Sequence, residues 1–189
     1  MLAMTFNDWQ TEAAEITIEG RAFINGQYTQ ALSGQTRPTI NPATGLVLAE
    51  VASCGPEDAD LAIAGARKAF ESGVWSKMAP VDRKMVLVRW AELIDKYAQE
   101  LSLLETLNVG KPINDTVHVD APAASRTIRW SGEAIDKVYE QIAPTPDKTL
   151  ALITRLPLGV VVAIVPWNFP LSTTAWKVAP ALATGNSVI

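Results

Sequence analysis

The sequence predicts an α/β protein whose last part is a strand, a helix and a second strand. Three observations carry this prediction. Turn-forming pairs near the N-terminus are flanked by short apolar segments, residues 56–139 place apolar side chains at helical spacing, and residues 158–189 hold two apolar runs separated by a helical stretch. Two parallel strands joined through a helix are the unit from which doubly wound nucleotide-binding sheets are built.

Two antiparallel hairpins are predicted before residue 55. Asn25 and Gly26 accept the positive φ of a tight two-residue turn, and apolar and aromatic residues flank them. A second turn over residues 41–45 separates residues 39–40 from the apolar run 47–51. We therefore expect two short strand pairs in this part of the chain.

The central part of the chain has the period of helices. Pro56 stands at a first-turn position with acidic residues behind it, and the helix that follows should end near Gly73. Residues 80–109 carry a longer apolar pattern that breaks at Gly110, which indicates two helices joined end to end. Residues 121–139 fit a further amphipathic helix.

A protruding β-ribbon is predicted next. Residues 141–143 and 149–156 surround a turn at residues 144–147, and the second segment alternates in side-chain character as a strand does. Such a ribbon often binds a partner.

The segment Val161–Leu171, VVAIVPWNFPL, is the most informative stretch of the chain. We expect Leu158–Val165 to form a fully apolar, buried strand. Pro166 and Pro170 bracket the three residues that follow, so the strand should deliver the amide of Asn168 to a rigid loop.

The last helix and strand complete the unit. Ser172 or Thr173 can cap a helix that runs through Ala183, and Gly185 ends it before a second apolar strand begins at residues 187–189. That strand has no partner after it, so we expect the source polypeptide to continue.

Composition narrows the function classes. The chain of 189 residues is 48% hydrophobic and 19% charged, as in a globular protein. It has 16 basic and 20 acidic residues, a formal net charge of −4, so no basic field attracts nucleic acid. Its apolar runs are far shorter than the roughly 20 residues that span a bilayer. We expect neither a nucleic-acid partner nor a membrane span.

The single cysteine, Cys54, cannot form an internal disulfide, and the N-terminus lacks the features of a secretory signal. We expect a cytoplasmic protein in which Cys54 is a small, semi-buried residue without a catalytic role. His118, the only histidine, is expected to face solvent in a loop. Glu105 and the other helix acids are expected to be solvated or to complement helix dipoles, and none is assigned as a general base.

Taken in order, several motifs resemble the aldehyde dehydrogenase superfamily and span nearly the whole chain. PWNFP between an apolar strand and a helix that ends in GNSVI is the most specific of them. The motifs are FINGQY, NPATG, ARKAFESGVW, LETLNVGKP, GEAIDKVY, RLPLGVVVAIVPWNFP and KVAPALATGNSVI. Within the family, SGEAIDKVY and FNDWQTEA are most similar to NAD-dependent γ-glutamyl-γ-aminobutyraldehyde dehydrogenases of putrescine breakdown, a route of polyamine degradation.

The resemblance implies the N-terminal part of the aldehyde dehydrogenase fold. Residues 1–138 and 158–189 would form the N-terminal part of an incomplete, Rossmann-like NAD-binding domain, and residues 139–157 would form a protruding oligomerisation β-hairpin. It also implies an oxidoreductase that is a homo-oligomer, a dimer or tetramer, in its full-length form.

The implied reaction is the oxidation of an aldehyde to the carboxylic acid, with aminoaldehydes as the candidate substrate class. A cysteine thiolate attacks the aldehyde, hydride passes to NAD, with NADP as the alternative, and a glutamate-activated water releases the acid from the thioester. The family's cysteine, glutamate and ribose-binding lysine would all lie beyond Ile189. We therefore expect the 189-residue chain alone to be inactive.

The resemblance assigns site residues at the end of the predicted strand. Asn168 matches the asparagine whose amide helps to hold the oxyanion, a task that suits a neutral donor fixed between prolines. Ile164, Val165, Pro166 and Trp167 match positions that line the cofactor, together with Asn168.

One position departs from the family pattern. Asn108 stands where relatives commonly carry an aspartate near Thr39 as part of a monovalent cation site, and the amide lacks the charge. We assign no metal. Two other functions stay open: a catalytically silent interaction module that acts through its hairpin, and a domain that binds cofactor without chemistry.

Overall fold

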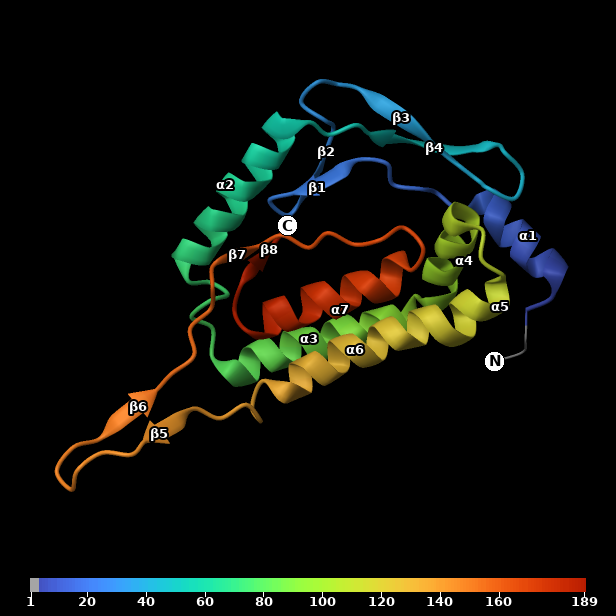
Figure 1. Ribbon diagram of the computed structural model, residues 1–189. Helices are drawn as coiled ribbons and strands as arrows, with labels where there is room; N and C mark the ends of the chain where they lie inside the picture. The colour runs from blue at the N-terminus through green and yellow to red at the C-terminus, as the bar shows by residue number, and fades with distance from the viewer. Residues whose placement is uncertain (1–3) are drawn as a thin grey trace.

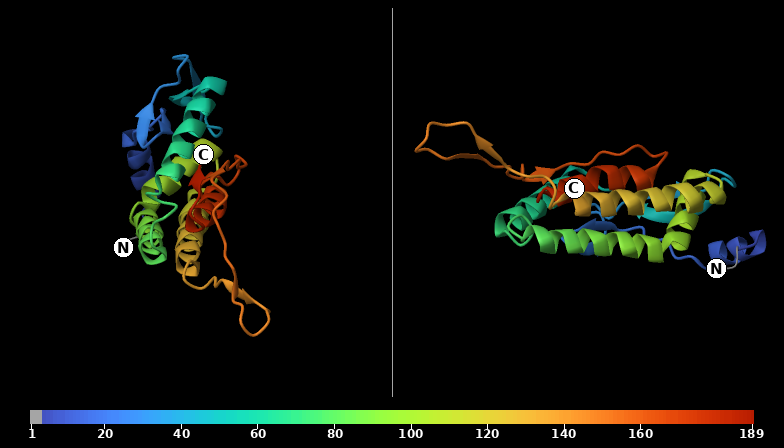
Figure 2. Two further views of the ribbon diagram at one scale, coloured as in Figure 1. Left: turned by 90° about the vertical axis from the view of Figure 1, so that its left-hand side faces the viewer. Right: turned by 90° about the horizontal axis from the view of Figure 1, so that it is seen from below.

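The computed structural model describes residues 4–189 (Figure 1). Three helices form its body: α3 (Pro80–Lys96), α6 (Ala121–Ala134) and α7 (Pro170–Ala183). Helix α2 (Pro56–Ser72) and the N-terminal hairpins lie together on one side of this body, and a ribbon projects from one end (Figures 1 and 2).

The first element within residues 4–189 is a helix that was not among the predicted elements, α1 (Phe6–Glu15). Thr5 and Asp8 cap it reciprocally. The amide of Asp8 donates to the Thr5 hydroxyl at 3.3 Å, and the Asp8 carboxylate accepts from the Thr5 amide at 2.7 Å. The spacing of a threonine and an acidic residue three positions later is the sequence signal for such a start.

Both predicted N-terminal hairpins are present. Strands β1 (Ala22–Ile24) and β2 (Gln27–Thr29) meet at Asn25 and Gly26, whose φ angles of 54° and 76° confirm the predicted turn. The second pair is antiparallel and contains a register shift after its fourth residue pair. Its strands are β3 (Thr36–Ile40) and β4 (Val47–Ala52).

The central helices largely follow the predictions. Helix α2 ends at Gly73, as predicted, and α3 continues through Tyr97 into α4 (Ala98–Val109), which ends at Gly110. Both glycines have positive φ, 79° and 82°, the left-handed backbone conformation that often ends a helix and that glycine adopts without strain.

A short helical segment leads from α4 to α6. It consists of α5 (Ile113–Asp115) and the π-helical turn η1 (Thr116–Asp120). Helix α6 ends at Ala134, although the predicted helix ran to residue 139. Its apolar pattern continues, but the Ile135 amide bonds to Gly132 and that of Lys137 to Ala134, so the backbone closes three-residue turns instead of helical ones.

The core lies where α3, α6 and α7 meet. Its many alanines let the helices approach closely, and burial of its larger aliphatic side chains is the main stabilising contribution. The buried apolar residues of this cluster are Leu87, Ala91, Ile94, Ala124, Ile128, Ala175, Ala179 and Ala183.

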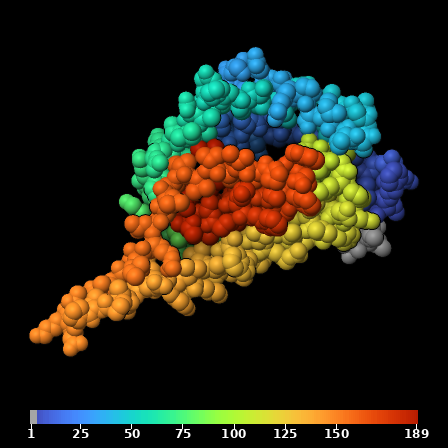
Figure 3. Space-filling view, viewed as in Figure 1, coloured from blue at the N-terminus to red at the C-terminus, as the bar shows by residue number. Residues whose placement is uncertain are grey.

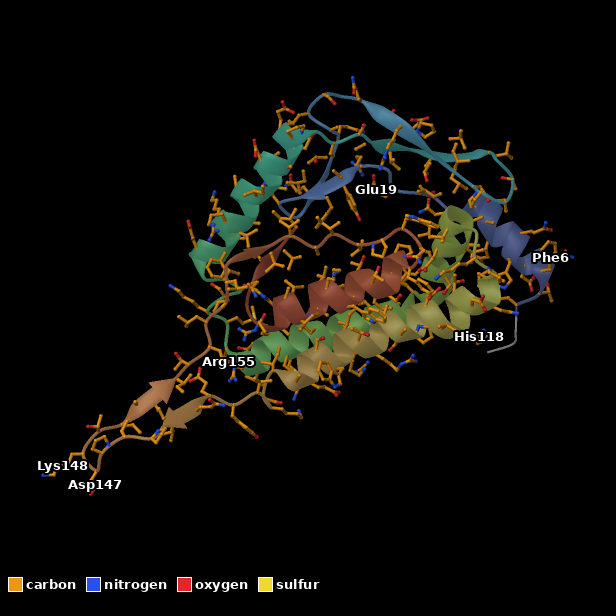
Figure 4. All side chains as sticks on the ribbon, viewed as in Figure 1. Phe6, Glu19, His118, Asp147, Lys148 and Arg155 are labelled. Carbon is orange, nitrogen blue, oxygen red and sulfur yellow. The ribbon has the colours of Figure 1, made fainter. Side chains whose placement is uncertain are left out.

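The ribbon consists of β5 (Gln141–Ala143) and β6 (Ala151–Ile153), which pair in antiparallel register. It extends away from the helices, and its tip carries Asp147 and Lys148 (Figures 3 and 4). Arg155 closes its base, donating from Nη1 to the Tyr139 carbonyl at 2.6 Å. The predicted hairpin is confirmed, with a second strand shorter than residues 149–156.

The C-terminal unit has the predicted order and a parallel strand pair, β7 (Val160–Val161) and β8 (Ser187–Val188). Asn186 supports this pair, because its Oδ1 accepts from the buried amide of Gly159 at 2.9 Å. The predicted strand Leu158–Val165 is wrong in length and burial: Leu158 is 89% exposed and Ile164 81%. Among residues 4–189, β7 pairs with β8 alone. Val161, Ala163 and Val165 are half-buried, but Val162 and Ile164 between them are exposed, so one face of the apolar run is uncovered.

The predicted capping of α7 by Ser172 or Thr173 is also wrong. The helix begins at Pro170, which places both residues inside its first turn, and no side chain caps it. Ser172 is buried, and the Thr173 hydroxyl donates to the Phe169 carbonyl at 2.6 Å. Within residues 4–189 no helix combines the length and apolar character needed to cross a bilayer.

Candidate functional site

The loop between β7 and α7 brings the predicted site residues together. After β7 the chain runs beside α7 and turns back at the N-terminal end of that helix, next to α4 (Figure 1). A loop that follows the carboxyl end of a parallel strand is the usual position of ligand sites in α/β proteins.

The side chains of this loop face outward. Trp167 and Ile164 are each 81% exposed, Pro166 is exposed, and Val165 is half-buried. Asn168 is exposed as well, and within residues 4–189 its side-chain amide has no hydrogen-bond partner. The loop therefore presents exposed apolar side chains beside an amide that has no hydrogen-bond partner among the described residues.

At the end of the loop, both the backbone and the side chain of Phe169 make contacts. Its carbonyl accepts from the backbone amide of Thr173 at 2.9 Å and from the hydroxyl of the same residue. Its ring contacts Lys111, whose Nζ lies 3.4 Å from the ring centroid. Asn168 thus directly precedes a residue that is anchored through both its backbone and its side chain.

Lys111 belongs to a buried charged cluster that was not predicted from the sequence. Its Nζ lies 2.7 Å from Asp120 Oδ2 and 3.3 Å from Glu105 Oε1. Both carboxylate side chains are only 3% exposed, so the expectation of a solvated Glu105 is wrong. Burial, and the nearby charge of Asp120, raise the pKa of Glu105. The signal in the sequence was an acid six residues before the lysine of a Gly-Lys-Pro turn.

The segment of the suspected cation site is adjacent to this cluster. The Thr39 hydroxyl donates to Asn108 Oδ1 at 2.7 Å, which confirms that β3 and α4 meet here. Thr39, Asn108 and Glu105 line a cavity of about 560 Å³ that extends to the first turn of α7. Residues 4–189 contain no cluster of three or more metal-ligating side chains.

Two other candidates lie apart from any cluster. Cys54 is exposed in the link between β4 and α2, so the expectation of a semi-buried residue is wrong. His118 faces solvent as predicted, but it belongs to η1 instead of a loop (Figure 4). Its Nδ1 lies 2.9 Å from the Asn114 carbonyl.

These features define an α/β protein whose last part is a strand, a loop, a helix and a second, parallel strand. Residues 28–189 match the aldehyde dehydrogenase family. Because this match covers most of the chain, the protein belongs to the aldehyde dehydrogenase family.

Curated relatives agree with this assignment. The chain is 51% identical over 181 residues to the NADP/NAD-dependent aldehyde dehydrogenase PuuC of Escherichia coli (strain K12), an alignment that covers 96% of this chain and 37% of the relative. It is 47% identical over 177 residues to an aminoacetaldehyde dehydrogenase of Pseudomonas aeruginosa, covering 94% of this chain and 36% of the relative. The chain thus spans a little over a third of the length of these relatives.

Solved structures share the fold. An indole-3-acetaldehyde dehydrogenase of P. syringae, solved with NAD+ and IAA, superposes with a TM-score of 0.97 at 54% identity, covering 98% of this chain and 38% of the other. The γ-glutamyl-γ-aminobutyraldehyde dehydrogenase of Burkholderia cenocepacia J2315 gives a TM-score of 0.96 at 52% identity with the same coverage. The predicted fold class, the N-terminal part of the aldehyde dehydrogenase fold, is confirmed.

Proposed function

We propose that this protein oxidises an aldehyde to the carboxylic acid with NAD, NADP being the alternative, and that the substrate is an aminoaldehyde. The observation that carries the proposal is the Pro166–Pro170 loop, which holds a free amide between β7 and the start of α7 in a chain of this family. The relatives named for aminoacetaldehyde and for γ-glutamyl-γ-aminobutyraldehyde support the substrate class.

The loop fits a nicotinamide cofactor. Ile164, Val165, Pro166 and Trp167 form the exposed apolar wall, and Asn168 adds an amide donor beside it. When bound there, NAD would supply the hydride acceptor. The residues of this chain would exclude water from one side of the cofactor and orient it against the aldehyde.

Asn168 is proposed as the oxyanion donor. When a thiolate adds to the aldehyde carbon, the carbonyl oxygen gains a negative charge, and a fixed N–H donor stabilises that charge without reorganising. A hydride acceptor bound beside this loop would allow the adduct to become a thioester, from which water would release the carboxylic acid and the free thiol. None of residues 4–189 is assigned as the nucleophile, since Cys54 is exposed and lies in another part of the chain.

A hybrid enzyme tests this function. Residues 1–189 replace the aligned segment of the E. coli relative, and NADH formation is followed with γ-glutamyl-γ-aminobutyraldehyde, aminoacetaldehyde and indole-3-acetaldehyde. We expect the highest kcat/KM with γ-glutamyl-γ-aminobutyraldehyde or aminoacetaldehyde. A folded hybrid that oxidises none of the three would contradict the proposal.

Substitution of Asn168 tests its role in the same hybrid enzyme. Asn168→Ala should lower kcat by about 10²-fold, because one oxyanion donor is lost. Asn114→Ala, which changes an exposed amide on α5, is the matched control and should keep full activity. Equal kcat values for the two variants would remove Asn168 from the catalytic site.

A second role is proposed for the ribbon. We propose that residues 139–157 form the contact of a homo-oligomer, and that residues 1–138 and 158–189 belong to the NAD-binding domain. Exposed apolar side chains on the ribbon support a contact role, among them Ile142 at 71%, Leu152 at 62% and Leu156 at 84%.

We also propose a cytoplasmic location, supported by the exposed free thiol of Cys54, which a reducing compartment protects from oxidation.

A further inference from the structure

The charged cluster under the Pro166–Pro170 loop joins three separate elements. Glu105 lies in the last turns of α4, Lys111 follows the end of that helix, and Asp120 ends η1. The Lys111 ammonium lies between the two carboxylates at 3.3 Å and 2.7 Å, and its side chain is 16% exposed. An ammonium in this environment has little freedom to move, because leaving either carboxylate would strand a buried charge.

The ammonium has a further contact that its ion pairs do not require. Its Nζ is 3.4 Å from the centroid of the Phe169 ring, a geometry in which the cation faces the negative π surface. Two carboxylates and one aromatic ring therefore surround this group. The ring belongs to the residue that directly follows Asn168 and precedes α7.

We propose that Lys111 is a positioning residue for the oxyanion donor: its ammonium, held by Glu105 and Asp120, fixes the Phe169 ring and thereby the direction of the Asn168 amide. This inference rests on the proposed function of Asn168. The hydrogen bonds from Thr173 reach only the backbone carbonyl of Phe169, whereas the Lys111 ammonium contacts its ring.

The charge balance of the cluster agrees with this role. One ammonium neutralises one carboxylate, and Glu105 Oε2 is buried without a hydrogen-bond partner among the described residues. Burial and the charge of Asp120 raise the pKa of Glu105, and Lys111 keeps both its 2.7 Å contact with Asp120 and its contact with the ring.

Activity in the hybrid enzyme provides the first test. Lys111→Met should lower kcat about tenfold, equivalent to about 1.4 kcal/mol, with less than a twofold change in KM for NAD. Lys111→Arg keeps a cation under the ring and should recover most of the loss. Phe169→Leu should lower kcat similarly, and the double variant should be no worse than the poorer single one. Lys84→Met, which breaks the Lys84–Asp136 pair at 2.6 Å, is the control and should leave kcat unchanged.

A signal independent of catalysis provides the second test. 4-Fluorophenylalanine placed at position 169 of the hybrid enzyme gives a single ¹⁹F resonance. It should shift in Lys111→Met and stay near its original position in Lys111→Arg and Glu105→Gln, which keep the cation and the Asp120 pair. An unchanged resonance in Lys111→Met would overturn the proposal.

The outcomes separate this inference from the proposed function. A shifted resonance with a coupled loss of kcat supports positioning by Lys111. A shifted resonance with additive losses, or with unchanged kcat, overturns it and leaves a structural ion pair, even if Asn168→Ala is inactive. An unchanged kcat in Asn168→Ala would overturn the oxyanion role by itself, whereas the resonance would still decide whether Lys111 holds the ring.

Discussion

Lys111 connects residues that lie far apart in the sequence but belong to one chemical unit. Its ammonium contacts Glu105, Asp120 and the ring of Phe169, so a turn after α4 is coupled to the loop before α7. Pro166 and Pro170 were visible as local restraints on that loop. The charged cluster beneath it depends on tertiary contacts, which residue spacing alone does not specify.

The raised pKa of Glu105 predicts how stability depends on pH. Its folded pKa lies above the unfolded value, so the native state binds more protons than the unfolded state between the two. Stability is therefore greatest below the ordinary glutamate pKa, as far as this group contributes, and falls as pH rises from there to the raised folded value. The free energy of unfolding changes by at most about 1.4 kcal/mol per pH unit for one proton.

Glu105→Gln should remove that decline. The amide keeps an oxygen near Lys111 and does not titrate, so the hybrid enzyme should show a flatter Tm profile above the ordinary glutamate pKa. The difference should be about 1 °C, since about 1 kcal/mol is divided by an unfolding entropy of about 2.1 cal/mol/K per residue over a hybrid chain of roughly 490 residues. Glu57→Gln, an exposed acid in the first turn of α2, is the control. Parallel Tm profiles for the original protein and Glu105→Gln would contradict the prediction.

Elements governed by local chemistry were predictable. The Asn25–Gly26 turn, the helix that starts at Pro56 and the left-handed helix ends at Gly73 and Gly110 all depend on the backbone preferences of a few neighbouring residues. The parallel arrangement of β7 and β8 followed from the strand, helix and strand order.

Elements whose burial depends on other segments were predicted less well. The run Leu158–Val165 has the composition of a strand covered on both faces, but only two of its residues pair in a β-ladder. Such a composition is typical of a strand that other segments cover on both faces, and residues 4–189 do not provide that cover. The end of α6 and the capping of α7 differed because three-residue turns and the position of Pro170 decided the helix boundaries.

The ribbon leads to an element-level prediction. Ile142 and Leu152 face each other across β5 and β6, and both side chains are mostly exposed. The double variant Ile142→Asp/Leu152→Asp places two like charges opposite each other on this surface and should prevent another subunit from binding it. Light scattering on the hybrid enzyme should then report a smaller assembly.

The control for this experiment lies at the ribbon tip. Asp147→Ala/Lys148→Ala changes charged residues at the end of the same hairpin and leaves its apolar surface intact (Figure 4). This variant should keep the original mass. If the aspartate variant also keeps that mass, the ribbon is not the oligomer contact.

At the scale of the whole molecule, the exposed area is large. The described structure exposes 12537 Å². A compact monomer of this mass exposes about 8800 Å², so the difference is about 3700 Å². Part of this extra area belongs to the projecting ribbon (Figure 3). Another part is apolar surface along residues 158–169 and beside the edge of β8 that has no partner strand among residues 4–189. A cavity of about 760 Å³ opens beside β8. Such surface favours association with further polypeptide.

The last prediction concerns residues 1–189 expressed alone. Because Leu158, Ile164 and Trp167 are each more than 80% exposed, the isolated chain should bind the dye ANS more strongly than the hybrid enzyme does. It should elute as an associated species and should not oxidise aldehydes. Adding the remaining segment of the E. coli relative should reduce ANS fluorescence if the two pieces cover each other's apolar surface. If the isolated chain is a monodisperse monomer that does not raise ANS fluorescence, its apolar surface does not require a covering partner. Aldehyde oxidation by the isolated chain would overturn the proposed cysteine mechanism.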